Sequence, residues 1–319
     1  MKNTVFVTLI VLVSLGIAGC NRQEKTEQVV IRMATGEITG TYYGFGTVVA
    51  PILSEAINIP ITVQPSTSSK ANILQINSGE VEIAIAQNDV MDYAWRGADL
   101  FNGEIINSFS CIAALYAEVC QIVINPVSGI KTVADLKGKN VSVGDAGGVV
   151  EYNARQILDA YDITFDDIAK QNLGFGASAD ALRENKIDAF FCIAGSPTPA
   201  VANLAADMDV AILEIDDEHA DRLMTNYRFY TRYPIPAGSY RGQDDEIQTV
   251  AVKAVFIVSS GLSQDTVYQL TKALFENKAQ IEAAHVKGRE LSPSFAVENI
   301  PVPFHIGAAK YLVEIGAFR

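Results

Sequence analysis

The chain has 319 residues, 49% of them apolar, and carries a net charge of −13 at pH 7 with histidine counted as neutral. This acidic balance argues against nucleic acids and anionic lipid surfaces as general partners. A chain of this length and apolar content can bury two modest hydrophobic cores.

The first twenty residues resemble an export signal. Lys2 precedes a short apolar run at 5–17, and small residues follow just before Cys20. A basic start, a short apolar stretch and small residues before the cut are typical of a secretory signal peptide. Polar residues interrupt the run, which is shorter than the roughly 20 apolar residues needed to cross a bilayer. We therefore expect residues 1–19 to be a signal peptide.

Cys20 stands where a bacterial lipobox has its lipid-bearing cysteine. Cleavage before Cys20 would make it the mature N-terminus and a lipid anchor, with residues 20–28 as a short polar tether. The alternative is a plain secreted protein in which Cys20 is incidental. We favour a soluble body in the periplasm that is tethered outside the cytoplasmic membrane.

Predicted strands and helices alternate through the body of the chain. In the first part, strands are expected at 29–34, 61–64, 82–86 and 112–116, and helices at 44–57 and 71–78. Apolar spacing and β-branched residues distinguish the two kinds of element. Strands that alternate with helices predict parallel α/β sheets.

The second part of the chain repeats this order. Strands are expected at 119–124, 140–143, 187–193, 210–215 and 249–258, and helices at 133–138, 149–161, 179–184 and 266–284. Residues 80–85 near the end of the first part parallel residues 186–191 in the second. Two similar α/β lobes in one exported chain suggest a receptor with a ligand cleft between them.

The first glycine loop, residues 35–44, follows a predicted strand and opens a helix. Free backbone amides at a helix start bind anions, and a glycine such as Gly40 lets a ligand approach the backbone. Thr41 adds a hydroxyl donor, while Tyr42 and Tyr43 add flat walls with polar tips. The loop lacks the Gly-Lys-Ser/Thr ending of a P-loop. The alternative is a tight turn with a capping threonine and two packed tyrosines.

The second glycine loop, residues 144–151, has the same place in the second part. Ligands of open α/β sheets bind beyond the carboxyl ends of the strands, where both loops would lie. Two helix starts facing one cleft would hold a small anion from both sides; the alternative is an ordinary glycine turn. Glu118 and Glu151 would either hold an ammonium group of the ligand or only cap a helix start.

Patterns for catalysis and metal binding are poor. His219, His285 and His305 have no metal-ligand spacing, and the Gly-x-Ser-x-Gly motif is absent. We therefore expect no metal, no cofactor and no catalysis.

The cysteines are interpreted as small core residues. Apart from Cys20 they are Cys111, Cys120 and Cys192. On one extended strand Cys111 and Cys120 would lie up to roughly 30 Å apart, too far for a disulfide. Cys192 acting as a nucleophile would define an enzyme alternative on the same fold.

Short segments of the chain stand in the order typical of a known family. In the first part they are Gly40-Thr41-Tyr42-Tyr43, 78–84, 87–90 and Ala114-Leu115-Tyr116-Ala117-Glu118. In the second part they are 135–139, 188–191, 236–244 and Pro303-Phe304-His305. Together they resemble the TAXI receptors, which are the solute-binding proteins of one branch of the TRAP transporters. The resemblance covers residues 29–319.

The resemblance implies an α/β fold of the two-lobed periplasmic-binding-protein kind, similar to type II. Each lobe would be a mostly parallel sheet flanked by helices, with the ligand in the interlobe cleft. Lobe 1 would comprise residues 29–120 plus 252–319, and lobe 2 residues 121–251. Crossing segments near 119–124 and 249–257 would form the hinge.

The resemblance also implies a receptor that closes on a small carboxylate or amino acid, with glutamate or a dicarboxylate favoured. Carried over by position, the ligand-binding residues would be Gly40, Thr41, Tyr42, Tyr43, Gln87, Tyr116, Glu118, Ala146, Gly147, Gly148, Val149 and Glu151. The receptor, expected to be a monomer, would deliver its ligand to a TRAP membrane subunit with fused small and large components. That subunit would import the ligand with a sodium gradient.

Two features depart from the family pattern. Gly147, Gly148 and Val149 stand where serine or threonine hydroxyls are common, which leaves only backbone amides. Glu37-Ile38 replaces the usual small residues of the first loop. Neither glycine loop contains an arginine that could clamp a carboxylate.

A periplasmic sensor subunit that binds the same ligands is a further alternative.

Overall fold

The two parts of the chain share one curved sheet of ten strands, described here for residues 30–318 in a computed structural model. Along the sheet the strands follow the order β2 (Ile61–Gln64), β1 (Ile31–Ala34), β3 (Ile83–Gln87), β10 (Ile247–Ser259), β4 (Phe109–Ile124), β7 (Ala189–Ala194), β5 (Asn140–Ser142) and β6 (Ala169–Gln171). Off this path, β8 (Ala211–Leu213) pairs with β4 and β9 (Thr231–Ile235) pairs with β10.

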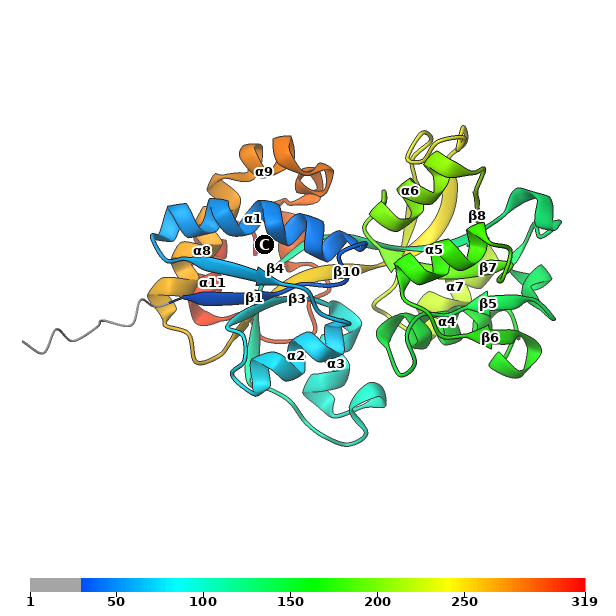
Figure 1. The fold of residues 1–319 in the computed structure, drawn as a ribbon. Coiled ribbons are helices and arrows are strands. Elements are labelled where there is room, and N and C mark those ends of the chain that lie inside the picture. Colours follow the sequence, from blue (N-terminus) through cyan, green and yellow to red (C-terminus); the bar gives the residue numbers. More distant parts are fainter. Residues whose placement is uncertain (1–29, 319) are drawn as a thin grey trace, which may run out of the picture.

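Parallel strands form both ends of the sheet, as the alternating pattern predicts. β1 pairs in parallel with β2 and β3, and β5 pairs in parallel with β6 and β7. β4 and β10 lie between these groups and are antiparallel to each other and to their outer neighbours. In Figure 1 both strands run from the lobe that contains β1 into the lobe that contains β7.

β4 belongs to both lobes. All 16 of its residues are buried, which matches its almost unbroken apolar sequence. Its first part pairs with β10, where Ala117 lies opposite Lys253, and its last part pairs with β7, where Ile122 lies opposite Phe191. The chain therefore passes between the lobes without leaving the sheet.

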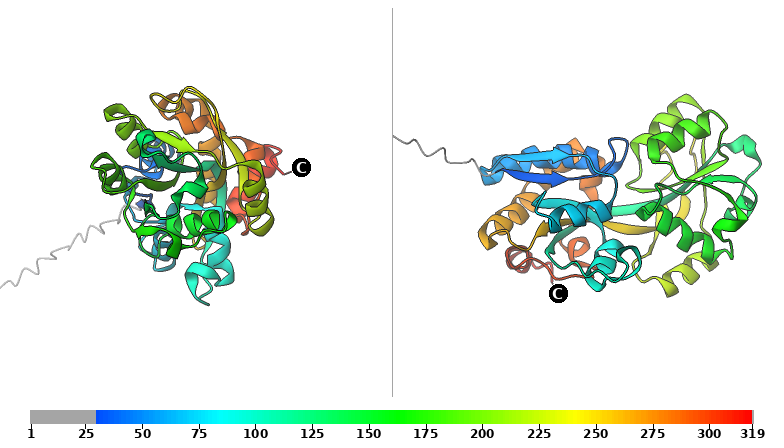
Figure 2. Two further views of the ribbon diagram at one scale, coloured as in Figure 1. Left: turned by 90° about the vertical axis from the view of Figure 1, so that its right-hand side faces the viewer. Right: turned by 60° about the horizontal axis from the view of Figure 1, so that its bottom comes forward.

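Helices cover both faces of the sheet in each lobe, as Figure 2 shows from two further sides. In the first lobe they are α1 (Thr41–Ile57), α2 (Ser69–Asn77), α3 (Asn88–Arg96), α8 (Gln264–Glu276), α9 (Lys278–Ala284), α10 (Pro293–Val297) and α11 (Ile306–Glu314). In the second lobe they are α4 (Val149–Ala160), α5 (Phe175–Arg183), α6 (Pro199–Asp207) and α7 (Asp217–Asn226). Short 3-10 turns are η1 (Asp99–Phe101), η2 (Pro126–Ser128), η3 (Val133–Leu136), η4 (Phe165–Asp167) and η5 (Val286–Glu290).

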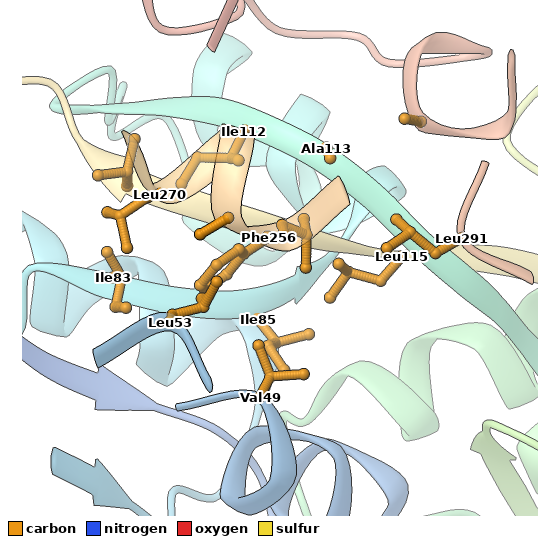
Figure 3. Close-up of a cluster of buried hydrophobic side chains, with 14 of the residues drawn as sticks. Val49, Leu53, Ile83, Ile85, Ile112, Ala113, Leu115, Phe256, Leu270 and Leu291 are labelled. Atoms are coloured by element: carbon orange, nitrogen blue, oxygen red, sulfur yellow. The ribbon is translucent and has the colours of Figure 1, made fainter. Parts of the chain in front are cut away.

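Each lobe has a hydrophobic cluster on either face of the sheet. In the first lobe, the cluster under α1 joins Val49 and Leu53 to Ile83 and Ile85 of β3 and to Phe256 of β10. Figure 3 shows these side chains meeting between the helix and the strands. The opposite face packs against α2 and α3. The second lobe is built in the same way around β5 and β7.

The predicted α/β class with two helix-covered, mostly parallel groups of strands is confirmed. Three details differ: the two groups are continuous through β4 and β10, the predicted strands 112–116 and 119–124 are one strand, and the predicted helix 266–284 is interrupted at Asn277. The Asn277 side chain donates to the carbonyl oxygen of Ala273 at 2.9 Å, which satisfies the end of α8. The hinge segments 119–124 and 249–257 lie within β4 and β10, and the lobe boundaries stay a prediction.

The predicted signal peptide, the lipid anchor Cys20 and the tether lie outside the described residues. Within residues 30–318, no helix is both long enough and apolar enough to cross a membrane.

Gly307→Ala should destabilise the first lobe. A Cβ atom at Gly307 would lie 2.2 Å from the carbonyl oxygen of Gln264 and 2.7 Å from the nitrogen of Tyr268, so α8 and α11 would have to separate. We expect a loss of about 2 kcal/mol in the free energy of unfolding, measured by urea denaturation. Gly44→Ala is the control, because a Cβ there meets only His285 at 3.6 Å. Equal stability of the two variants would contradict this packing.

Candidate functional site

A cavity lies between the lobes beside β4. Together with its opening to solvent, it comprises about 600 Å³ of empty space. From the first lobe it is lined by Gly36, Glu37, Gly40, Thr41, Tyr42, Thr67, Ser68, Ser69, Gln87 and Glu118. From the second lobe it is lined by Gly144, Asp145, Gly148, Val149, Val150, Gly174, Phe175, Ile193 and Ala194.

Five helices begin at the wall of this cavity. The residue before the first turn of each one lines it: Gly40 for α1, Ser68 for α2, Gln87 for α3, Gly148 for α4 and Gly174 for α5. Only Ser68 caps its own helix through its side chain. Helix starts present free N–H groups and the positive end of the helix dipole. The wall therefore suits an anionic group of a ligand.

Three carboxyl groups also line the cavity. Glu37 and Glu118 come from the first lobe and Asp145 from the second. The described residues of the wall include no lysine, arginine or histidine. A ligand that is only anionic would meet these carboxyl groups without a countercharge. The combination of helix starts and acids instead suits a ligand with one negative and one positive group.

Glu118 is the buried acid of this set. It projects from β4, is 2% exposed, and accepts a hydrogen bond from the Tyr42 hydroxyl at 2.9 Å. Burial raises the pKa of Glu118 to about 8, although hydrogen bonds from Gln87 and Tyr42 act in the opposite direction. At pH 7 the carboxyl group is therefore mostly protonated. An ammonium group beside it would favour the ionised form.

Gln87 adds an acceptor next to Glu118. Its backbone N–H donates to the Ser69 hydroxyl at 3.1 Å, and the Tyr42 hydroxyl lies 3.4 Å from the same oxygen. The Gln87 side-chain carbonyl is buried and accepts no hydrogen bond from any described residue. A buried acceptor without a donor costs free energy. A donor group on a ligand would remove this cost.

Seven of the twelve predicted binding residues line the cavity. They are Gly40, Thr41, Tyr42, Gln87, Glu118, Gly148 and Val149. Thr41 also crosses the cleft, because its hydroxyl donates to the carbonyl oxygen of Gly195 at 2.8 Å. The two glycine loops thus meet at one cavity, as their position after strands predicts.

The other five predicted residues do not line the cavity. Tyr43 is partly exposed on α1, and Ala146 and Gly147 face solvent at the tip of their loop. Tyr116 is fully buried behind the wall and packs edge-on against Phe45, with 5.1 Å between ring centroids.

Glu151 is held by its own lobe. It accepts a hydrogen bond from the N–H of Gly147 at 2.6 Å and pairs with Lys170 at 2.6 Å. These contacts lower the pKa of Glu151 against the opposing effect of desolvation, which is the largest influence on it. The carboxylate therefore braces the second glycine loop from outside the cavity.

Sequence reasoning missed several residues of the wall. Thr67, Ser68 and Ser69 follow β2 as a run of hydroxyl residues. Such a run indicates a helix start, so the sequence contained a signal for these residues. Ser68 indeed accepts from the N–H of Ala71 at 3.2 Å. Gly174 and Phe175 gave no such signal, because nothing local to them indicates which helix start faces the cleft.

Cys192 does not line the cavity. It is fully buried in β7, and burial raises the pKa of its thiol. Cys111 and Cys120 are also buried and free, so no disulfide joins them. Among residues 30–318 there is no group of three or more histidine, cysteine, aspartate or glutamate side chains that could hold a metal ion.

The fold is that of the periplasmic solute-binding proteins. Solved structures with this fold include the periplasmic aliphatic sulphonate binding protein SsuA from Escherichia coli, with TM-score 0.50, 15% identity, and coverage of 89% of this chain and 82% of that one. The substrate binding protein of an amino acid ABC transporter has TM-score 0.50 and 15% identity, covering 80% and 97%. The GluR0 ligand binding core in complex with L-glutamate has TM-score 0.50 and 13% identity, covering 83% and 100%.

A family assignment follows from the sequence of the same region. Residues 33–316 match the model of the NMT1-like family, and the chain belongs to this family. The match spans both lobes and therefore all the residues that line the cavity.

Glu118→Gln should weaken the pH dependence of folding stability. The raised pKa, about 8 in the folded state against a usual 4.5, means that protonated Glu118 stabilises the folded state fully below about pH 4.5. This contribution is lost as the pH rises through 8. Between pH 6 and 9 the wild type should lose about 3 kcal/mol more than the variant, measured by urea denaturation. Glu104→Gln, at an exposed position, is the control; equal losses in all three proteins would contradict the burial effect.

Proposed function

We propose that the protein is an extracytoplasmic solute receptor that captures a small amino acid by closure of its two lobes. The observation that carries this proposal is the convergence of five helix starts and the buried Glu118 on one interlobe cavity. The starts of α1 and α4, which no side chain caps, would bind the ligand carboxylate. Glu118 and the Gln87 carbonyl would bind the ammonium group.

Closure would supply the affinity. A ligand that touches both lobes favours the closed state, because that state alone offers all its contacts. A dissociation constant of about 1 μM needs roughly −8 kcal/mol, which a few charge-assisted hydrogen bonds can provide. Tyr42 from the first lobe and Phe175 from the second add apolar contact to the cavity wall.

The resemblance to TAXI receptors favours glutamate or a dicarboxylate as the ligand class. The acidic wall supports an amino acid over a plain dicarboxylate, because Glu37 and Asp145 would repel a second carboxylate and Glu118 offers a partner to an ammonium group. We therefore regard glutamate and related amino acids as the first compounds to test.

Delivery to a sodium-coupled TRAP membrane subunit is the transport route that the sequence motifs support. The structural relatives also include a component of an ABC transporter. The energy source of uptake distinguishes a TRAP route from an ABC route. Uptake in cells that produce the protein should stop when the sodium gradient is collapsed and persist when it is maintained. A periplasmic sensor would give ligand binding without any uptake.

Ligand titration tests the proposed function. Calorimetric titrations of the purified protein with L-glutamate, L-glutamine and succinate should show binding of at least one amino acid and weaker or no binding of succinate. Glu118→Gln should weaken amino acid binding at least about tenfold, because the ammonium group loses its counterion. Glu151→Gln, outside the cavity wall, should change affinity by less than about threefold. Binding of succinate alone would contradict the proposed polarity.

Thiol modification tests the enzyme alternative. Native protein should resist alkylation by iodoacetamide at Cys192, since the side chain is fully buried and its thiol pKa is raised. Mass spectrometry of the treated protein measures this directly. Rapid, stoichiometric alkylation of Cys192 with loss of ligand binding would favour the alternative.

A further inference from the structure

The loop from 36 to 41, between β1 and α1, reaches across the cleft to the second lobe at three points. The Thr41 hydroxyl contacts Gly195, as described above. The carbonyl oxygen of Thr39 accepts a hydrogen bond from the N–H of Ala200 at 3.1 Å, near the start of α6. The third contact is made by the carboxylate of Glu37, and it is the only one of the three that carries charge.

Glu37 caps a helix of the opposite lobe. Its two carboxylate oxygens lie 3.1 and 3.4 Å from the backbone nitrogen of Phe175, the first residue of α5. The residue before it, Gly174, has no side chain to serve as a cap. A residue 138 positions away in the sequence thus takes the role that a serine or aspartate usually has.

The second lobe is shaped to admit this carboxylate. A Cβ atom at Gly174 would lie 2.9 Å from a Glu37 oxygen, so any larger residue would displace the acid. On the other side of the contact, a Cβ atom at Gly40 would lie 3.6 Å from the Phe175 ring. The distance at Gly40 is an ordinary contact, so the glycine that allows the loop and the start of α5 to approach closely is Gly174.

The position of Glu37 determines the charge of this part of the cavity wall. Glu37, Asp145, Gly174 and Phe175 all line the cavity, and the N–H of Phe175 at the start of α5 is already occupied by the Glu37 carboxylate. Burial and the neighbouring charge of Asp145 raise the pKa of Glu37. A second carboxylate on a ligand that extended toward α5 would meet two acids from opposite lobes and no free amide at Phe175.

We propose that Glu37 is a specificity-determining residue that discriminates against ligands with a second carboxylate; this inference rests on the proposed function. The protein supplies its own carboxylate to α5, which leaves the starts of α1 and α4 for the single carboxylate of the ligand. Among amino acids of equal size, the wild type should therefore bind L-glutamine more tightly than L-glutamate. The discrimination comes from repulsion of the wrong ligand, because the two compounds share all other groups.

The test compares Glu37→Gln and Glu37→Ala with the wild type in titrations with L-glutamine and L-glutamate. Glu37→Gln keeps an acceptor for Phe175 and removes the charge, so the affinity ratio should shift at least about tenfold toward L-glutamate. Glu37→Ala also frees the α5 amides and should shift the ratio further in the same direction. Urea denaturation of each variant monitors folding, and the isosteric glutamine variant carries the test where the alanine variant is unstable.

The outcomes separate this inference from the proposed function. Binding of both amino acids with the same ratio in wild type and Glu37→Gln would overturn the role of Glu37 and leave the receptor function standing. Tighter binding of L-glutamate by the wild type would also overturn it. Failure of the wild type to bind any amino acid would overturn the proposed function and the role of Glu37 with it.

Discussion

The antiparallel pair of β4 and β10 is the constraint on which the rest of the structure depends. Each strand continues through both lobes, so the two groups of parallel strands are fixed to the same central pair. This brings the end of β3, the middle of β4 and the end of β7 to one cavity, where Gln87, Glu118 and Ala194 line the wall. Any rotation of one lobe against the other must bend this pair, which lies directly beside the cavity.

The chemistry of the cavity follows from two opposed kinds of charge. Helix starts provide partial positive charge from the backbone, whereas Glu37, Glu118 and Asp145 provide acids from side chains. Backbone amides need no particular side chain, so Gly148 and Val149, which have no hydroxyl groups, can still form part of the proposed site. The specificity then rests on the few acids, of which Glu118 is the buried one.

Most of the fold was predictable from the sequence because its signals are local. Alternating strands and helices indicated the α/β class, and the two glycine loops indicated where helices begin near a cleft. The union of the lobes into one sheet was not predictable, since it depends on the pairing of β4 with β10, more than a hundred residues apart in the chain. Tyr43 and Glu151 were expected in the site because they stand in the right loops, but neither lines the cavity, and Glu151 pairs with Lys170 instead. Glu37 meets α5 only through tertiary structure, so its partner could not be seen in the sequence.

The protonated state of Glu118 has a consequence for the energetics of capture. With a pKa of about 8 the carboxyl group holds a proton at neutral pH, and Tyr42 and Gln87 surround it in the closed wall. A cationic group that takes its place beside the ionised carboxylate must displace that proton into the solvent. Ligand binding would then exchange the proton of Glu118 for the cationic group of the ligand. The buffer would take up the released proton. The heat of binding would depend on the buffer's ionisation enthalpy, and the affinity would rise with pH until Glu118 is ionised in the free receptor as well.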